Sequence, residues 1–187
     1  MTLNELKNQC TQCRKCSLCE GRTNVVFGGG NENADILLIG EAPGANEDIE
    51  GKPFIGRSGK LLDSMLQEVG LSREKNIYIT NTAKCRPPEN RDPKPAETAV
   101  CLEWLSQQIE IIKPKIIVCV GRISAQKIID KGFKVTQQHG EFVERNGIFY
   151  TATYHPAAIL RNINNKPYAL EDWKKIRDKA LEAGAVL

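Results

Sequence analysis

Four short apolar runs recur along this chain, and each is followed by a polar or glycine-bearing segment. They cover residues 36–40, 77–80, 116–120 and 149–154. Continuous apolar runs of this length are typical of strands that are buried on both faces of a sheet. Apolar residues at helical spacing occupy 60–69, 97–112, 123–131 and 169–183. Strands that alternate with helices predict an α/β domain with a parallel sheet.

The segments that follow these strands are the best candidates for a functional site. In a parallel α/β sheet, the carboxyl ends of the strands meet at one edge, and ligands bind there. Three of the four following segments are unusual in their polar and proline content, at residues 41–48, 81–91 and 155–162. We therefore expect a ligand-binding cleft that these three segments share.

Length and composition restrict the class of protein. A chain of 187 residues fits one domain, so we predict a single domain over residues 1–187. Hydrophobic residues at 41% argue against a disordered chain. No apolar run approaches the roughly 20 residues that cross a bilayer, and the N-terminus has no signal pattern, so we expect a soluble cytoplasmic protein without membrane contacts. The net charge of +3 permits a nucleic acid partner without requiring one.

Cysteine is the most informative residue type. Four of the seven cysteines occur at every third position, as Cys10, Cys13, Cys16 and Cys19, and the others are Cys85, Cys101 and Cys119. An odd number of cysteines in a chain without a secretory signal disfavours a disulfide framework and favours metal ligation or reactive thiols. Cys-x-x-Cys pairs bind zinc and iron–sulfur clusters alike, so the spacing leaves the metal undecided.

Geometry suggests where further metal ligands would come from. Four ligands at unbroken x-x spacing would crowd one turn, so a second pair from elsewhere in the chain is easier to accommodate. Cys85 and Cys101 are the candidates, since one follows a strand and the other lies on the next helix. Cys119 lies inside an apolar strand and is expected to be a small core residue.

Residues 51–58 nearly match the phosphate-binding loop G-x-x-x-x-G-K-[ST]. Arg57 occupies the lysine position, and the stretch begins well after the strand that ends at Gly40. We interpret it instead as a tight loop at a helix start, capped by Ser58, where free backbone amides could hold a DNA phosphate.

Several single residues stand out near the predicted edge. His155 follows a buried strand and precedes a proline, whereas His139 lies in a polar turn and is expected to be structural or solvated. Glu41 directly follows a strand, so its carboxylate is expected inside the cleft. Phe54 is either a core residue or a platform for a planar ligand. Cations suited to phosphate contacts surround the same edge, at Lys84, Arg86, Arg91, Lys94 and Arg161.

Three motifs occur in order along the chain. They are Gly40-Glu41-Ala42-Pro43-Gly44 through Gly51-x-Pro53-Phe54-x-Gly56, then Asn81-Thr82-x-Lys84-Cys85-Arg86-Pro87-Pro88-x-Asn90-Arg91-x-Pro93, then His155-Pro156-Ala157-Ala158-x-Leu160-Arg161. Together they resemble the type-four uracil-DNA glycosylases, the iron–sulfur branch of that superfamily. The resemblance implies a three-layer domain with a four-stranded parallel sheet between helices. It also implies an N-terminal iron–sulfur ligand segment and a [4Fe-4S] cluster held by Cys13, Cys16, Cys85 and Cys101.

The same resemblance implies a repair reaction. Such an enzyme flips uracil, the product of cytosine deamination, out of DNA and hydrolyses its N-glycosidic bond, which leaves an abasic site. The implied uracil-binding residues are Gly40, Glu41, Ala42, Phe54, Asn81 and His155. The implied catalytic residues are Glu41, Glu47 and His155, and the implied DNA contacts are Arg86, Arg91 and Arg161. We expect a monomer that acts on uracil-containing DNA.

The resemblance also suggests what the individual side chains do. Phe54 would stack on the flipped base, and Asn81 would bond its Watson–Crick edge. His155 would donate to the departing uracil oxygen, and Glu41 or Glu47 would stabilise the sugar cation and position water. Two other classes stay open, namely a non-catalytic DNA-binding module whose cluster senses redox state, and an iron–sulfur electron carrier.

Overall fold

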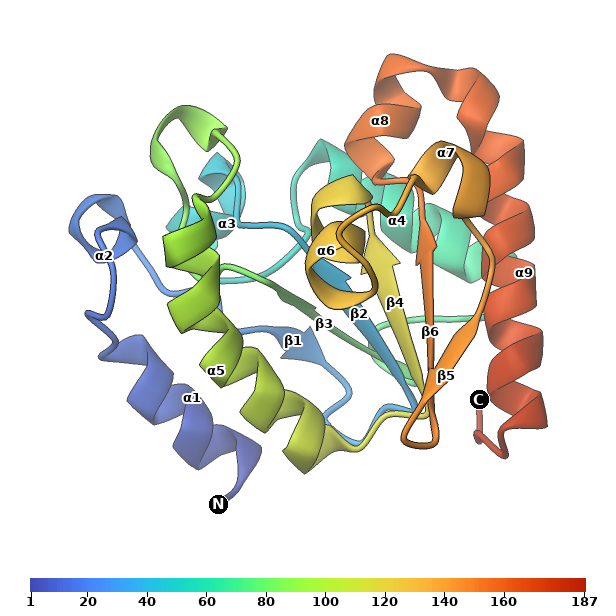
Figure 1. Cartoon of the computed structure of the whole chain (residues 1–187), viewed down its shortest axis with the longest axis horizontal. Coiled ribbons are helices and arrows are strands. Elements are labelled where there is room, and N and C mark those ends of the chain that lie inside the picture. Colours follow the sequence, from blue (N-terminus) through green and yellow to red (C-terminus); the bar gives the residue numbers. More distant parts are fainter.

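The structure is a computed structural model that describes residues 1–187, and its centre is one sheet of six strands (Figure 1). The strand order is β1-β3-β2-β4-β6-β5. The strands are β1 Gly29–Gly30, β2 Ile36–Gly40, β3 Ile77–Asn81, β4 Ile116–Val120, β5 Val143–Arg145 and β6 Ile148–Thr153. The four central strands are parallel, and the two outer strands run antiparallel to their neighbours. The α/β prediction is confirmed.

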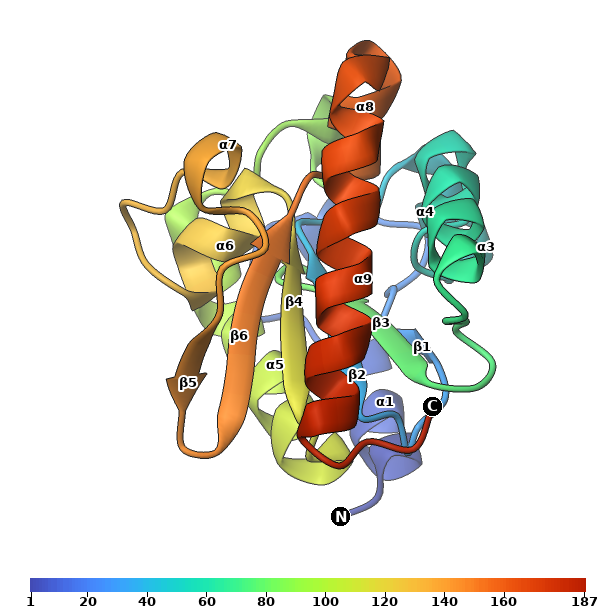
Figure 2. The ribbon, with the colours of Figure 1, turned by 90° about the vertical axis from the view of Figure 1, so that its right-hand side faces the viewer.

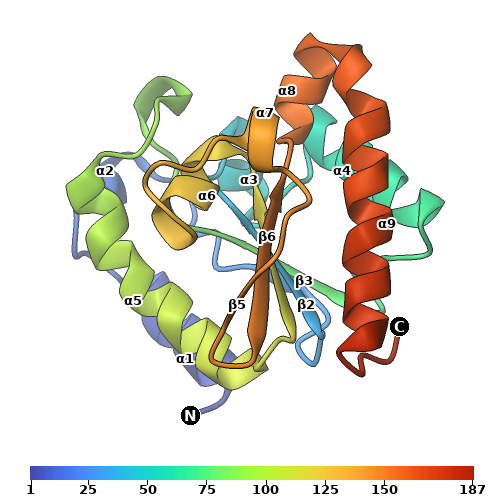
Figure 3. The ribbon, with the colours of Figure 1, turned by 45° about the vertical axis from the view of Figure 1, so that its right-hand side comes forward.

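Helices cover both faces of the sheet, so the domain has three layers. Helices α1 and α5 lie on one face, and α4 and α9 lie on the other (Figures 2 and 3). The helices are α1 Leu3–Thr11, α2 Leu18–Gly21, α3 Ala45–Glu50, α4 Arg57–Glu68, α5 Pro95–Ile112, α6 Arg122–Ile128, α7 Val135–Gln138, α8 Pro156–Arg161 and α9 Lys166–Glu182, with short 3-10 turns η1 Pro88–Asn90 and η2 Ile163–Asn165. No helix combines the length and apolarity that crossing a membrane requires.

The apolar strands build two cores because successive side chains point to opposite faces. On β2, Leu38 belongs to the larger core with Leu62 of α4 and Trp173 of α9. Its neighbour Leu37 belongs to the smaller core with Leu6 of α1. Because both faces are covered, a strand such as β2 is apolar at every position and is buried throughout.

The prediction of four parallel strands holds for the centre of the sheet and misses its two edges. Strand β1 consists of two glycines and so has no side-chain pattern, and all three residues of β5 are exposed. The turn between β5 and β6 is Asn146-Gly147, with φ of 52° and 79°. Asn-Gly between strands is a strong hairpin signal, and it could have revealed β5.

Two helix predictions are corrected by the structure. Helix α4 begins at Arg57 after Gly56, so Ser58 lies within its first turn and makes no capping hydrogen bond. Helix α6 ends at Ile128, whereas the sequence pattern extended to residue 131. The predicted pattern included residues 129–131, which lie in the loop between α6 and α7.

Candidate active site

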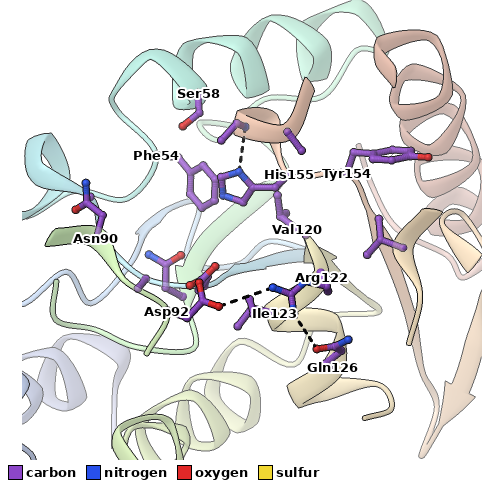
Figure 4. Close-up of a pocket in the computed structure, with 18 of the residues that line it drawn as sticks. Phe54, Ser58, Asn90, Asp92, Val120, Arg122, Ile123, Gln126, Tyr154 and His155 are labelled. Carbon is purple, nitrogen blue, oxygen red and sulfur yellow. Dashed lines mark hydrogen bonds and ion pairs between the residues drawn. The ribbon is translucent and has the colours of Figure 1, made fainter. Parts of the chain in front are cut away.

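A cavity of about 870 Å³ opens at the carboxyl ends of the parallel strands (Figure 4). Segments that follow β2, β3, β4 and β6 line it, together with the turn before α4. The lining includes the predicted residues Glu41, Ala42, Glu47, Phe54, Asn81, Arg91, His155 and Arg161. The cavity therefore lies at the edge that the strand topology predicts.

Because Gly40 has no side chain, the Phe54 ring and the Asn81 amide can lie side by side next to it. A Cβ atom at this position would collide with Asn81 Oδ1 and would lie 2.6 Å from Cζ of Phe54. A Cβ at Gly59 would likewise collide with the Phe54 carbonyl. Phe54 and Asn81 are both buried against the cavity. The pair forms a slot suited to a flat ligand with hydrogen-bonding edges.

The turn that presents Phe54 is held from two sides. Phe54 has a φ of 50°, which is a costly conformation for a residue with a side chain. Glu47 Oε1 accepts hydrogen bonds from the amides of residues 55 and 56, each at 3.2 Å. From the other side, Arg73 donates to the carbonyls of residues 53 and 54, at 2.9 and 2.8 Å. The sequence did not identify Arg73, which lies outside the three motifs.

His155 is fixed as a neutral hydrogen-bond donor. Its Nδ1 accepts the Ala157 amide at 3.0 Å, so the proton of the neutral ring is on Nε2 (Figure 4). Burial lowers the pKa of His155 to about 4, and the charge of Arg161 lowers it further in the same direction. The ring centroid lies 5.6 Å from that of Phe54. At neutral pH, His155 therefore offers an N–H to the slot without carrying a charge.

Glu41 belongs to a charged group with two residues that the sequence analysis did not select. Arg122 Nη2 lies 3.7 Å from Asp92 Oδ2, and Figure 4 shows Arg122 between Asp92 and Gln126. Burial raises the pKa of Glu41 to about 7, and the Asp92 carboxylate contributes to the rise while Arg122 opposes it. Glu41 therefore exchanges its proton near neutral pH, as catalytic carboxyl groups often do.

The three predicted DNA-contacting arginines differ in whether their guanidinium groups already have partners within the protein. Arg91 makes a bidentate ion pair with Glu97, at 2.9 and 2.8 Å, which lowers the pKa of that carboxyl to about 2. The Nε of Arg86 donates to Asn90 Oδ1 at 2.8 Å. Arg161 is exposed at the cavity and belongs to none of the ion pairs. Arg161 is the member of the set most available to a phosphate.

The four predicted metal ligands converge from the α1–α2 loop, the loop after β3 and helix α5. Cys16 packs against the small apolar cluster that contains Cys85. Burial raises the pKa of Cys101, and the neighbouring Cys16 and Cys13 raise it as well. All seven cysteines are free thiols. No three His, Cys, Asp or Glu side chains lie close enough together to hold a single metal ion.

Nitrogen donors surround the converging sulfurs. They are the Lys84 amide on Cys101 Sγ at 3.2 Å, the Arg22 guanidinium on Cys85 Sγ at 3.3 Å and the Trp104 indole on Cys13 Sγ at 3.4 Å. Hydrogen bonds to ligand sulfurs are a recurrent feature of iron–sulfur sites. This donor set fits a thiolate-ligated cluster, which is larger than a single ion.

The remaining cysteines differ in position. Cys119 is fully buried in β4, which confirms the prediction of a core residue, and burial raises the pKa of its thiol. Cys10 is buried between α1 and α5, where burial raises its pKa to about 12. Cys19 is half-buried on α2. The buried thiols of Cys10 and Cys119 are therefore held in the protonated form.

His139 has the structural role that the prediction of a structural or solvated histidine includes. Its Nδ1 lies 2.9 Å from both carboxylate oxygens of the buried Asp172. The Thr153 hydroxyl donates to the same carboxylate at 2.7 Å. Asp172 lies on α9, 33 residues from His139, so no local pattern could indicate the pair.

Comparisons with known proteins identify the relatives of this chain. A family model described as "Uracil DNA glycosylase superfamily" matches residues 27–177. A "Type-4 uracil-DNA glycosylase" of Sulfurisphaera tokodaii is 45% identical over 190 residues, which cover 96% of this chain and 86% of the relative. The protein of the same name from Archaeoglobus fulgidus is 45% identical over 183 residues, or 94% of this chain and 92% of the relative. The one from Thermotoga maritima is 42% identical over 170 residues, or 89% and 88%.

Proposed function

The chain belongs to the type-4 group of the uracil DNA glycosylase superfamily, and from this premise we propose that it removes uracil from DNA by hydrolysing the N-glycosidic bond. The product would be an abasic site, which base excision repair then replaces with an intact nucleotide. The observation that carries the proposal is the slot in which Phe54, Asn81 and His155 meet beside Gly40. A base can enter such a slot only after it leaves the DNA stack.

Base selection follows from the groups in the slot. Phe54 stacks on the flipped ring, and the Asn81 amide bonds the N3–H and O4 edge of uracil. Cytosine presents the opposite donor and acceptor pattern along that edge. Binding it would leave buried polar groups without partners, which is a strong basis for rejection.

Bond cleavage moves negative charge onto uracil and positive charge onto the sugar. The Nε2–H of His155 donates to the departing uracil oxygen and stabilises the negative charge. Backbone amides near Gly40 and Ala42 lie at the same strand end and assist. A carboxylate stabilises the sugar cation and orients the attacking water.

The geometry favours Glu41 over Glu47 as that carboxylate. Glu47 Oε1 is already engaged by the two amides that shape the Phe54 turn. Glu41 lines the cavity, and its carboxyl ionises near neutral pH. Glu47 therefore acts mainly by holding the base-stacking residue in place.

Cys13, Cys16, Cys85 and Cys101 are the proposed ligands of a [4Fe-4S] cluster. Their convergence and the three N–H donors on their sulfurs support this assignment. When bound, the cluster would connect the N-terminal segment to the loop that follows Asn81, the last residue of β3. Its contribution is then structural, because metal binding energy stabilises the segments that supply the ligands.

The proposed DNA contacts come from one chain. Arg161 reaches a phosphate beside the flipped nucleotide, and Arg86 and Arg91 contact the backbone near the second motif. Because every residue of the slot comes from the same chain, a monomer suffices for the reaction. We place this repair activity in the cytoplasm.

An oligonucleotide cleavage assay tests the proposal. A duplex with a single uracil is incubated with the protein and treated with alkali, which cuts only at abasic sites. The expected result is a cut at uracil and none in a matched thymine duplex. A DNA-binding redox sensor would bind the uracil duplex and leave it uncut, and an electron carrier would neither bind nor cut it. Either of these results would refute the proposal.

A further inference from the structure

A buried carboxyl group of helix α9 contacts the strand that precedes His155. Asp172 is fully buried, and Figure 2 shows α9 crossing the face of the sheet beside β4 and β6. Its Oδ2 accepts the Thr153 hydroxyl at 2.7 Å, and both of its oxygens lie 2.9 Å from Nδ1 of His139. Thr153 is also fully buried and is the last residue of β6. Because a buried carboxyl group without partners is costly, the fold holds these three side chains together.

His139 and the glycine after it make further contacts with the same stretch of chain. The His139 ring centroid lies 4.9 Å from that of Tyr154, the residue that follows β6. The Gly140 amide donates to the Ala152 carbonyl at 2.9 Å. Gly140 has a φ of 71°, and a Cβ atom there would collide with Oδ1 of Asp172. The end of β6 is therefore held by side-chain and backbone contacts that all come from one cluster.

His155 directly follows this stretch of chain. Figure 4 shows its ring beside that of Phe54, whereas the Tyr154 ring points the opposite way. On the β4 side, the Gly121 amide donates to the Thr153 carbonyl at 2.9 Å. A Cβ atom at Gly121 would lie only 2.9 Å from Cβ of His155, so the chain is closely packed there. The place of the His155 ring in the slot thus depends on what holds the end of β6 from the α9 side.

We propose that Asp172 is a positioning residue that fixes the end of β6, through Thr153 and His139, so that Nε2–H of His155 meets the departing uracil oxygen. Asp172 and His139 do not line the cavity, so they act without touching the base. The proposal rests on the proposed function, because it assumes the role of His155. A displacement of about 1 Å in such a donor can cost roughly 10² in rate, so a buried contact behind the site can control the reaction.

A double-mutant cycle in single-turnover kinetics tests the proposal. Asp172→Asn keeps the volume and replaces one acceptor oxygen with a donor. We expect uracil excision to slow by roughly 10–10², and the affinity for the uracil duplex to change by less than about twofold. In a His155→Ala background, Asp172→Asn should change the rate by less than about twofold, because no donor is left to misplace. A loss that comes from general unfolding would instead appear equally in both backgrounds.

Substitutions on β6 keep the test decisive if Asp172→Asn folds poorly. Thr153→Val removes the hydroxyl that donates to Asp172 and should slow excision by roughly 3- to 10-fold. Thr153→Ser keeps that hydroxyl and should restore most of the rate. Thr151→Val is the matched control, because Thr151 is equally buried on the same strand and its hydroxyl has no hydrogen-bond partner. Its rate should stay at the wild-type value.

The possible failures can be told apart. Equal losses from Asp172→Asn in both backgrounds would overturn the proposal, and so would wild-type rates in both Asp172→Asn and Thr153→Val. A loss in Thr151→Val as large as that in Thr153→Val would also overturn it. If the wild type cuts uracil DNA and His155→Ala cuts it equally fast, this proposal fails and the glycosylase function stands. A wild type that leaves uracil DNA uncut would refute the proposed function, and this proposal with it.

Discussion

His155 is the neutral donor of the proposed mechanism, and its backbone partner and its burial both favour that neutral form. His155→Ala removes the donor to the departing uracil oxygen. We expect the single-turnover rate to fall by roughly 10²–10³, the usual scale for one lost donor of this kind, with a smaller change in DNA affinity. Single-turnover kinetics and a binding titration on the same uracil duplex measure both quantities. A rate close to that of the wild type would remove His155 from the chemistry.

Glu41 should give the reaction its pH dependence near neutrality. Its carboxyl must be ionised to stabilise a sugar cation, and its pKa is raised to about 7. The single-turnover rate should therefore rise with pH through about 7. His155 stays neutral over this range because its pKa is about 4. A rate that does not change between pH 5.5 and 8.5 (roughly one and a half units either side of that pKa) would exclude Glu41 as the acting carboxylate.

Asp92 and Arg122, the charged neighbours of Glu41, should move the midpoint of this pH–rate profile in opposite directions. Asp92→Asn removes a negative charge that opposes ionisation, so the midpoint should shift to lower pH. It should stay above the ordinary value of 4.5, because burial is the larger cause of the raised pKa. Arg122→Gln removes the charge that favours ionisation and should shift the midpoint to higher pH. Shifts of the same sign in both variants would contradict this arrangement.

At the scale of elements, the turn over residues 53–56 should depend on Arg73, which lies outside the cavity. Arg73→Met removes two hydrogen bonds to turn carbonyls and the contact with Asp63. We expect a loss of about 1–3 kcal/mol in unfolding free energy and weaker binding of uracil DNA, with unchanged affinity for undamaged DNA. Denaturant titration and binding assays measure these effects. Equal weakening on both DNAs would show that Arg73 contacts DNA and does not position Phe54.

The central elements could be predicted from the sequence because burial on both faces leaves a plain apolar pattern, as in β2 and β4. The edge strands could not, because the two glycines of β1 carry no pattern and β5 is exposed. The site shows the same division. Asn81 ends a strand and His155 follows one, so both are visible in the sequence, whereas Asp92 and Arg73 acquire their roles from partners that only the tertiary fold supplies.

At the scale of the whole molecule, substitutions can separate the proposed cluster ligands from the other cysteines. Serine in place of Cys13, Cys16, Cys85 or Cys101 should abolish iron binding and destabilise the fold. Serine at Cys19 or alanine at Cys10 or Cys119 should leave the iron bound, at about four iron atoms per chain in protein purified without oxygen. Iron analysis and the visible spectrum measure the outcome. If Cys10 or Cys19 proves essential in place of Cys13 or Cys16, the assigned ligand register is wrong.

The reading of uracil by Asn81 in a closed slot is the claim on which the proposed function depends, and Asn81→Asp tests it most directly. The carboxylate accepts where the amide donated, so it opposes uracil O4 and suits the amino group of cytosine. Single-turnover excision is measured on two duplexes that differ only in uracil or cytosine at one position. We predict that the wild type cuts at uracil alone, and that the variant is slower on uracil and gains cleavage at cytosine. A variant that cuts uracil at the wild-type rate and leaves cytosine untouched would contradict the claim.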